Sequence, residues 1–153
     1  MGPILIYPND VLRLVSNPVD IPLSREDKEL LDEMYTYVKE HKDDAVGLSA
    51  IQVGIPKRMC AIRSCADGKS FNYKLVNPRI VKRSPRTYVH HEGCLSVEGD
   101  GSDSVVRHES VTVTGYDAIS NKQVVINASG FEAAILQHEI DHMDGKLYID
   151  RIR

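Results

Sequence analysis

The side chains best placed to do chemistry are two histidines and a glutamate near the C-terminus, in residues 137–142 (QHEIDH). His142 follows His138 by four positions, so in a helix both imidazoles lie on one face and can reach one divalent metal ion. Glu139 directly follows the first histidine, where its carboxylate can hold or move a proton of a metal-bound water. The pattern favours a metal centre, and the alternative is a pair of core histidines hydrogen-bonded to backbone carbonyls.

The helix that carries these residues is expected to be buried. Its apolar residues fall on two sides, which is typical of a helix inside a protein core. Neutral histidines inside a core need polar partners, and a metal ion is an efficient one. Gly145 then allows the helix to end. One stripe holds Phe131, Ile135, His138 and His142, and the other holds Leu136, Ile140, Met143 and Leu147.

A third metal ligand is expected, because a catalytic site of this kind usually takes three protein ligands and leaves one position open. The chain has three cysteines. Cys60 lies in an apolar run that predicts a buried strand, and Cys65 precedes a turn signal that predicts a position near the surface. Cys94 lies in a predicted loop or strand end, where Gly93 permits close approach of the backbone. Spacing alone makes Cys94 the best of the three candidates and does not exclude the others.

Three separated segments together resemble the peptide deformylase family: residues 47–54 (GLSAIQVG), 92–96 (EGCLS) and 137–142 (QHEIDH). They occur in the family's order, and the similar stretch runs from about residue 4 to residue 151, nearly the whole chain. The resemblance implies a metal-dependent hydrolase that removes the N-formyl group from the N-terminal formyl-methionine of newly made polypeptides and releases formate.

The resemblance also implies that Cys94, His138 and His142 bind one divalent metal ion. In this family the ion is typically Fe²⁺, which Zn²⁺ or Ni²⁺ often replaces in purified material. Such an ion lowers the pKa of a bound water from about 15.7 toward roughly 7, so hydroxide forms at neutral pH. Glu139, as general base and acid, would take a proton while the hydroxide attacks the formyl carbon, and would return it to the leaving amine.

Gln52 and the backbone N–H of Leu95 are implied to form an oxyanion hole. Donors aimed at the charge that develops in the transition state are worth about 3 kcal/mol each. Val46 and Gly47 are implied to offer backbone groups to the substrate, which would add to a strand edge near Gly47. Without the other two motifs, Gln52 would be read as an ordinary glutamine at the end of a strand.

Glu92 precedes the cysteine by two positions and is not expected to touch the metal. We expect it to pair with an arginine, for which Arg107 is the natural candidate, and so to brace the loop that carries Cys94. The alternative is that both residues are simple surface charges.

Five positions depart from the family pattern. Ala45 replaces the first glycine of a glycine-rich opening, and Ser49 and Ile51 stand where alanine and proline are common. Glu98 occupies the place of a proline, and Ala134 that of a larger residue in the pocket for the methionine side chain. These departures bear on substrate preference and rate and leave the chemistry intact.

Length and composition predict one globular domain. With 153 residues and 42% hydrophobic content, the chain is expected to bury roughly two-thirds of its unfolded surface. Residues 1–153 are expected to form a single peptide deformylase-like catalytic domain. Many family members continue into a C-terminal extension, whereas this chain ends at Arg153. Ribosome docking through such an extension is therefore not expected.

Charge and cysteine content bear on partners and location. The net charge of −3 leaves no broad basic field, so no direct nucleic-acid binding is expected, and Lys82, Arg83 and Arg86 are interpreted as a solvated loop. The chain lacks a long apolar stretch and a signal-peptide pattern, so no membrane association is expected. Free cysteines fit a reducing compartment, and a cytoplasmic location is expected. The implied partners are formyl-methionyl nascent peptides, with a transient contact to the ribosome.

The fold class expected is α+β, with antiparallel or mixed strands wrapped around a central C-terminal metal-binding helix and a second helix packed outside. Ser24 and Asp27 resemble a capping box at the start of the second helix, which would bury Leu30, Leu31, Met34, Tyr35 and Val38. Strands are expected around residues 49–51, 59–62, 73–76 and 79–82, and a hairpin is expected to pair 111–115 with 124–126.

Two other classes of protein fit parts of the pattern. A zinc peptidase also uses two histidines and a glutamate in this spacing, but usually takes a third ligand from a histidine or an acidic residue. A non-catalytic binding module with a vestigial site is the second alternative. The complete set of Gln52, Cys94, His138, Glu139 and His142 argues against it. A peptide deformylase releases formate, whereas a peptidase cleaves peptide bonds, so the product distinguishes the two classes.

Overall fold

The computed structural model describes residues 1–66 and 68–153. Two α-helices, seven β-strands and three short 3₁₀ helices follow one another along the described chain. In order they are η1 (Asp10–Arg13), α1 (Arg25–Glu40), β1 (Gly47–Ser49), η2 (Ala50–Val53), β2 (Met59–Ala66), β3 (Lys69–Arg83), β4 (Thr87–Glu92), β5 (Asp103–His108), β6 (Ser110–Asp117), β7 (Lys122–Ser129), α2 (Gly130–Met143) and η3 (Tyr148–Arg151).

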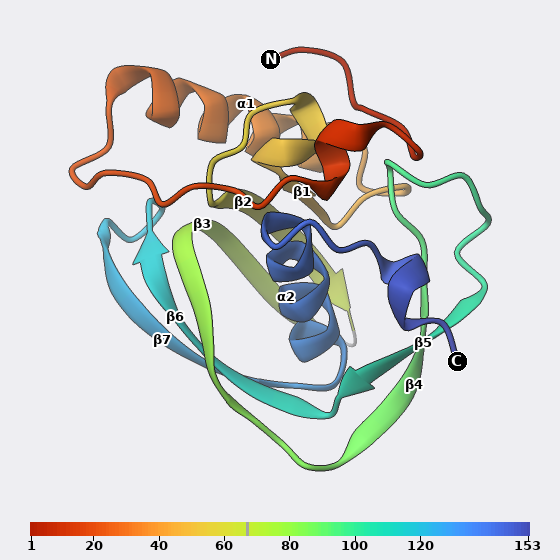
Figure 1. Ribbon diagram of the computed structural model, residues 1–153. Helices are drawn as coiled ribbons and strands as arrows, with labels where there is room; N and C mark the ends of the chain where they lie inside the picture. Colours follow the sequence, from red (N-terminus) through yellow and green to blue (C-terminus); the bar gives the residue numbers. More distant parts are fainter. Residues whose placement is uncertain (67) are drawn as a thin grey trace.

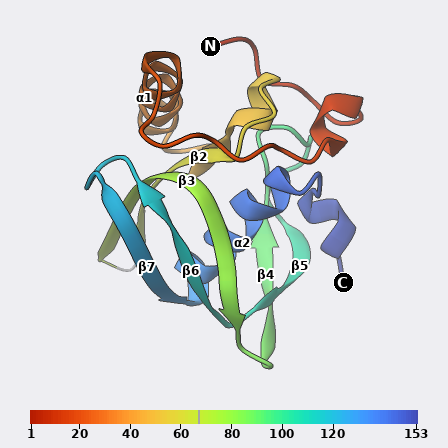
Figure 2. The same ribbon diagram turned by 60° about the vertical axis from the view of Figure 1, so that its left-hand side comes forward.

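The strands form two antiparallel sheets that enclose α2 (Figure 1). The larger sheet has five strands in the order β1-β2-β3-β6-β7, and β4 pairs with β5 in a separate two-stranded sheet. In Figures 1 and 2, α2 lies between these sheets, whereas α1 lies outside them. The expected α+β fold, with strands around a central C-terminal helix and a second helix outside, is therefore confirmed.

Strand β3 connects the two sheets because it is long and bent. Its pairing with β6 shifts register between Val76 and Arg79 and again between Ile80 and Lys82. Such irregularities bend a strand and increase its twist. The bend carries the chain around α2 to β4, which leads directly to Cys94. The sequence predicted two strands in this region, and the structure merges them into one.

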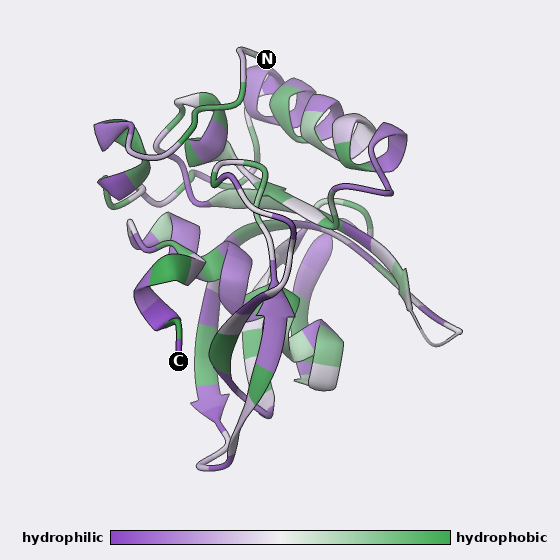
Figure 3. Cartoon of the chain, turned by 90° about the vertical axis from the view of Figure 1, so that its right-hand side faces the viewer, coloured by the Kyte–Doolittle hydropathy of each residue, from purple (hydrophilic) through white to green (hydrophobic). Residues whose placement is uncertain are grey.

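Helix α1 begins as its sequence predicts. The Ser24 hydroxyl accepts a hydrogen bond from the backbone N–H of Asp27 at 3.1 Å, which satisfies one of the free donors at the helix start. Four of the five residues expected in the core are buried, and Tyr35 is partly buried. Figure 3 shows both hydrophobic and hydrophilic residues along α1, as expected for a helix with one buried side.

Helix α2 is buried on several sides. Ten of its residues are buried, Gln137, Glu139, Asp141 and His142 among them. Its apolar side chains pack with those of the large sheet, including Leu75, Val113 and Ile126. The helix ends at Met143, and Gly145 adopts a φ of +74°, as expected for a glycine that follows a helix.

The expected hairpin is confirmed, with Val113 of β6 opposite Ile126 of β7. The strand expected around residues 49–51 is wrong in part, since β1 ends at Ser49 and η2 begins at Ala50. The chain turns there because the side-chain oxygen of Gln52 accepts the backbone N–H of Ser49, and Gly54 closes the turn with a φ of +85°.

Strands β4 and β5 were not predicted from the sequence. In β4, exposed and partly buried residues alternate, and the three residues at its end, His90, His91 and Glu92, are all polar. The usual apolar signal of a strand is therefore missing. Among the described residues, no helix combines the length and hydropathy that crossing a bilayer requires.

Candidate active site

The three expected metal ligands converge from distant parts of the chain. Cys94 directly follows the loop residue after β4, and His138 and His142 lie one turn apart on α2. One ligand atom from each residue lies within 4.8 Å of the others, and the Cys94 Sγ to His142 Nε2 distance is 3.5 Å. A tetrahedral site with ordinary metal–sulfur and metal–nitrogen distances separates those two atoms by about 3.6 Å. The donor set therefore fits a divalent metal ion such as zinc or iron.

The first histidine is oriented by a buried carboxylate. His138 Nδ1 lies 2.8 Å from Glu92 Oε1, which leaves its Nε2 for a metal ion. Arg107 donates two hydrogen bonds to Glu92, from Nε at 2.8 Å and from Nη2 at 2.7 Å. Only 6% of Glu92 and 2% of Arg107 are exposed. The expected pairing of the two residues is confirmed, and the alternative that they are surface charges is wrong.

The ion-pair network extends further than the sequence suggested. Arg107 Nη1 also donates to Asp141 at 2.7 Å, and Asp141 accepts two hydrogen bonds from Arg151 of η3. Each buried charge of this network therefore has an oppositely charged partner. The network joins β4, β5, α2 and the C-terminal turn around the candidate metal site.

The surroundings set the charge states of these groups. Burial acts to raise the pKa of Glu92, but hydrogen bonds from Arg107 and His138 outweigh it and hold that pKa well below its ordinary value. Burial lowers the pKa of His142 well below its ordinary value, so its imidazole is neutral, the form that binds metals. For His138, burial acts to lower the pKa, whereas hydrogen bonds to Cys94 and Glu92 raise it.

Glu139 lies inside the site with only 3% of its surface exposed. Burial raises the pKa of its carboxyl group, and the charge of His138 and a hydrogen bond from Ser49 partly oppose this rise. A carboxylate with a raised pKa is suited to accept and return a proton near neutral pH. Gly47 allows the carboxylate to lie there, because a Cβ atom at Gly47 would meet Glu139 Oε2 at 2.6 Å.

Gln52 is held so that its amide NH₂ group faces the site. Its Oε1 accepts the backbone N–H of Ser49, and its Nε2 donates to Ser96 Oγ at 3.0 Å. The same nitrogen donates its other hydrogen toward Cys94 Sγ at 3.7 Å, a long hydrogen bond beside the candidate metal position. Leu95 follows Cys94 and lines the same cavity.

Strand β1 is an edge strand of the large sheet, and its backbone groups alternate in direction. The Val46 carbonyl accepts the backbone N–H of Arg63 at 2.9 Å, which directs it toward β2. Gly47 is opposite Ile62 in the next register position, where an antiparallel strand turns its N–H and C=O away from its partner. Gly47 therefore presents its backbone at the open edge, whereas the carbonyl of Val46 is already engaged.

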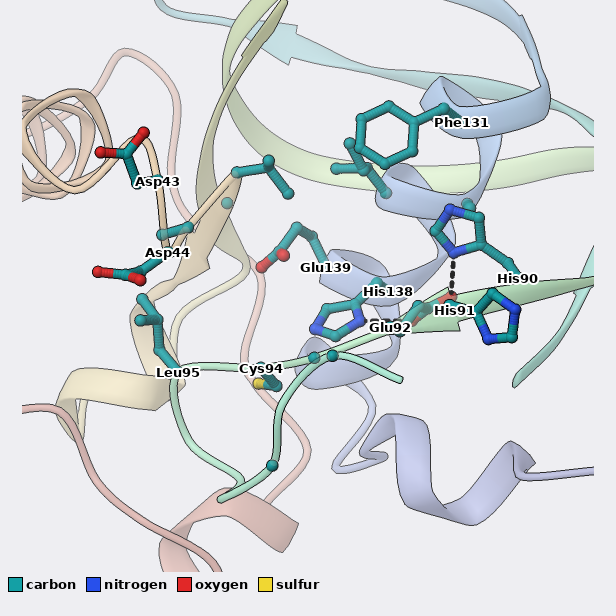
Figure 4. A pocket seen from close by; sticks show the side chains of 18 of the residues that line it. Asp43, Asp44, His90, His91, Glu92, Cys94, Leu95, Phe131, His138 and Glu139 are labelled. Carbon is teal, nitrogen blue, oxygen red and sulfur yellow. Dashed lines mark hydrogen bonds and ion pairs between the residues drawn. The ribbon is translucent and has the colours of Figure 1, made fainter. Parts of the chain in front are cut away.

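A cavity of about 580 Å³ lies against these residues. Figure 4 shows Glu139 and His138 close to Cys94, with His90 and Phe131 further along the wall. His90 and His91 come from β4, so sequence analysis missed them along with that strand. The cavity walls include Val46, Gly47, His90, His91, Glu92, Cys94, Leu95, Phe131, Ala134, Ile135, His138 and Glu139.

Charged residues line the other side of the cavity. Asp43 and Asp44, which follow α1, lie across from His90 in Figure 4, and Lys42 and Asp100 also belong to the lining.

The alanine at position 45 is compatible with the fold. Among the described residues, the non-glycine residues with positive φ are Asn77 and Asn121, so Ala45 does not carry the strain that would require glycine.

One thiol and two imidazoles around a common point, with a buried glutamate beside them, define the class of metal-dependent hydrolases. Comparison with known proteins agrees. The model of the polypeptide deformylase family matches residues 1–153. The chain belongs to the peptide deformylase family, whose members are metallohydrolases that remove the N-formyl group from nascent peptides. The resemblance identified in the sequence is confirmed.

Individual relatives support this assignment across most of their length. A peptide deformylase from Shouchella clausii is 38% identical to this chain, over 94% of this chain and 85% of the relative. Peptide deformylase 2 from Geobacillus stearothermophilus is 37% identical, over 92% and 83% of the two chains. A peptide deformylase from Rhizobium meliloti is also 37% identical, over 98% of this chain and 84% of its own.

Solved structures are similar as well. The crystal structure of a peptide deformylase from Legionella pneumophila matches with a TM-score of 0.87 and 37% identity, over 100% of this chain and 86% of that chain. A probable peptide deformylase from Synechococcus phage S-SSM7 matches with a TM-score of 0.86 and 31% identity, over 99% and 100% of the chains. The similarity therefore covers the entire fold described above.

The contact between Gly47 and Glu139 leads to a first prediction. Gly47→Ala should lower kcat about 100-fold, because the new methyl group must displace the Glu139 carboxylate, and misplacement by about 1 Å has an effect of that size. The measurement is the steady-state rate of formate release. Gly99→Ala is a matched control at the same cavity, where the added Cβ would meet its nearest neighbour at 3.4 Å. Equal rates for both variants would contradict the prediction.

The depressed pKa of Glu92 leads to a second prediction. Its ordinary pKa is 4.5, and folding lowers it. The ionised group therefore contributes stability that is complete above about pH 4.5 and is lost as the pH falls through the folded-state pKa. Urea unfolding is measured between pH 7 and pH 3. The difference in the free energy of unfolding between wild type and Glu92→Gln should be constant near pH 7 and should shrink toward pH 3. A difference independent of pH would refute this account of the network.

Proposed function

We propose that this chain hydrolyses the formyl–nitrogen bond of formyl-methionyl peptides at a metal ion held by Cys94, His138 and His142, with Glu139 as general base and acid. The observation that carries the proposal is the convergence of the three ligand atoms within 4.8 Å beside a buried carboxylate. Water is consumed, and formate and a free peptide amine are the products.

The donor set suits several divalent ions, because a thiolate with two imidazoles accepts iron, zinc and nickel. When bound, the ion acts as a Lewis acid and allows a water molecule to lose a proton near neutral pH. We propose Fe²⁺ as the ion in the cell, with Zn²⁺ or Ni²⁺ able to replace it. Thiolate ligation by Cys94 then makes the protein sensitive to oxidation, since thiolates are readily oxidised. Metal analysis after purification without oxygen tests the choice of ion.

Glu139 carries the proton through the reaction. Its carboxylate receives the proton that water loses as the formyl carbon is attacked, and it returns a proton to the peptide nitrogen when the carbon–nitrogen bond breaks. Burial raises its pKa, which supports both halves of this role. Gly47 leaves the space in which the carboxylate lies.

Gln52 and Leu95 stabilise the negative charge on the former formyl oxygen. The hydrogen that Gln52 Nε2 directs toward Cys94 Sγ over 3.7 Å would turn to this oxygen, and the backbone N–H of Leu95 would supply a second donor. Donors fixed before the reaction are worth about 3 kcal/mol each in the transition state, because they need not reorganise. Neither donor carries a charge that would repel the metal ion.

The substrate backbone binds along the open edge of β1. Gly47 offers its N–H and C=O there, and an extended peptide would add as a further antiparallel strand. The methionine side chain enters the part of the cavity walled by Val46, His90, Phe131 and Ala134. The carbonyl of Val46 already accepts a hydrogen bond from Arg63, so we assign Val46 to the wall of this pocket.

We further propose that residues 1–153 act as one catalytic domain in the cytoplasm and contact the ribosome transiently. A single domain is supported by the enclosure of α2, which packs against the large sheet and is hydrogen-bonded to β5 of the small one. Formylated chains are produced at the ribosome, so a contact there would bring enzyme and substrate together. Co-sedimentation with ribosomes that carry nascent chains tests this contact.

Removal of the proton carrier gives the third prediction. Glu139→Gln should lower kcat for a formyl-Met tripeptide by about 10²- to 10⁴-fold, the usual contribution of acid–base catalysis, while the metal content stays near that of the wild type. Treatment with a chelator should abolish formate release, and added Fe²⁺ or Ni²⁺ should restore it. Chromatography of the products should show no cleavage of unformylated peptides, since peptide-bond cleavage without formate release would identify a peptidase.

A fourth prediction concerns the strand edge. Replacing the main-chain amide that follows methionine in the substrate by an ester removes one N–H donor. It should raise KM about 5- to 10-fold, since one hydrogen bond contributes about 1 kcal/mol. An ester placed beyond the cavity is the matched control and should change KM little. Identical kinetics for the two ester substrates and the parent peptide would argue against binding along β1.

A further inference from the structure

Ser49 occupies a position between the two side chains to which catalysis is assigned. It is the last residue of β1, and none of its surface is exposed. Its hydroxyl donates toward Glu139 Oε1 at 3.0 Å and toward the backbone oxygen of Glu139 at 3.1 Å. Its backbone N–H donates to Gln52 Oε1 at 2.9 Å. One residue therefore touches both the proton carrier and the oxyanion donor.

The backbone contact decides which way the Gln52 amide faces. A backbone N–H can only donate, so the Gln52 atom opposite Ser49 must be the carbonyl oxygen. The NH₂ group is then directed to Ser96 Oγ and Cys94 Sγ, on the side of the candidate metal site. Gln52 is 1% exposed, so water does not compete for these contacts.

The hydroxyl contact ties Glu139 to β1. Both acceptors belong to Glu139, so Ser49 connects β1 to this residue of α2 whichever oxygen accepts the hydrogen. The hydroxyl hydrogen of Ser49 is directed to Glu139 in the active site, although Ser49 is also the residue that precedes η2. Hydrogen bonds to a charged acceptor are stronger than those between neutral groups.

We propose that Ser49 is a positioning residue for deformylation, which orients the Glu139 carboxylate through its hydroxyl and the Gln52 amide through its backbone N–H. The inference rests on the roles proposed above for Glu139 and Gln52. It adds that both roles are set by one residue at the end of the edge strand. A small residue that only fills space between β1 and α2 would need no hydroxyl, and this difference can be measured.

The test removes and restores the hydroxyl. Ser49→Ala should lower kcat about tenfold, the effect of losing one hydrogen bond to a charged group, while KM and metal content stay within about twofold of wild type. Ser49→Thr, which restores a hydroxyl, should recover most of kcat. Ser16→Ala is the matched control: Ser16 is 3% exposed, its Oγ has no partner among the described residues, and the variant should keep wild-type kcat.

Wild-type kcat in Ser49→Ala would overturn the inference, as would an equal loss in Ser16→Ala. If the alanine variant is unstable, Ser49→Cys is measured in its place, because its thiol fills a similar volume and donates weakly. A tenfold lower kcat in the cysteine variant supports the inference, and wild-type kcat overturns it.

Two further variants separate this inference from the proposed function. In a Glu139→Gln background, Ser49→Ala should cause no further loss beyond about twofold, because the hydroxyl acts through Glu139; multiplied losses would contradict this. If Glu139→Gln alone keeps wild-type kcat, the proposed function fails. If Glu139→Gln is inactive while Ser49→Ala is fully active, only the role of Ser49 fails.

Discussion

The active site depends on the interactions that one buried carboxylate makes, that of Glu92. It receives two hydrogen bonds from Arg107 and lies 2.8 Å from the first histidine of α2. Cys94 follows it by two residues, so the same carboxylate fixes the backbone that carries the thiol. Burying such charges is favourable only when each is fully paired, and Asp141 completes the pairing. The geometry of the candidate metal ligands is thus built on a buried ion-pair network.

This arrangement links metal binding to the stability of the fold. Cys94 comes from the end of the small sheet, whereas His138 and His142 belong to the central helix. An ion bound by all three would join these parts, and its binding free energy would add to the free energy of folding. The large sheet contributes from the other side, where Gly47 and Ser49 of β1 contact Glu139. The edge strand β1 and Glu139, the proposed proton carrier, are therefore in direct contact.

Much of the fold could be predicted because local signals agreed with it. The cap at Ser24, the periodic apolar residues of α1 and the hairpin between β6 and β7 all rest on short-range patterns. Strands β4 and β5 could not be predicted, because residues such as His90 face a cavity and carry no apolar signal. The turn after Ser49 was also missed, since it depends on a contact made by the Gln52 side chain.

The sequence by itself determined the chemistry. The segments at residues 47–54, 92–96 and 137–142 resemble those of the peptide deformylase family, and that resemblance implied the reaction class. Only the tertiary structure places Cys94 beside the histidines, because their convergence across more than 40 residues requires the end of β4 to pack against α2. The contact between the Ser49 hydroxyl and the Glu139 carboxylate is likewise set by the tertiary structure, because it requires β1 and α2 to pack together.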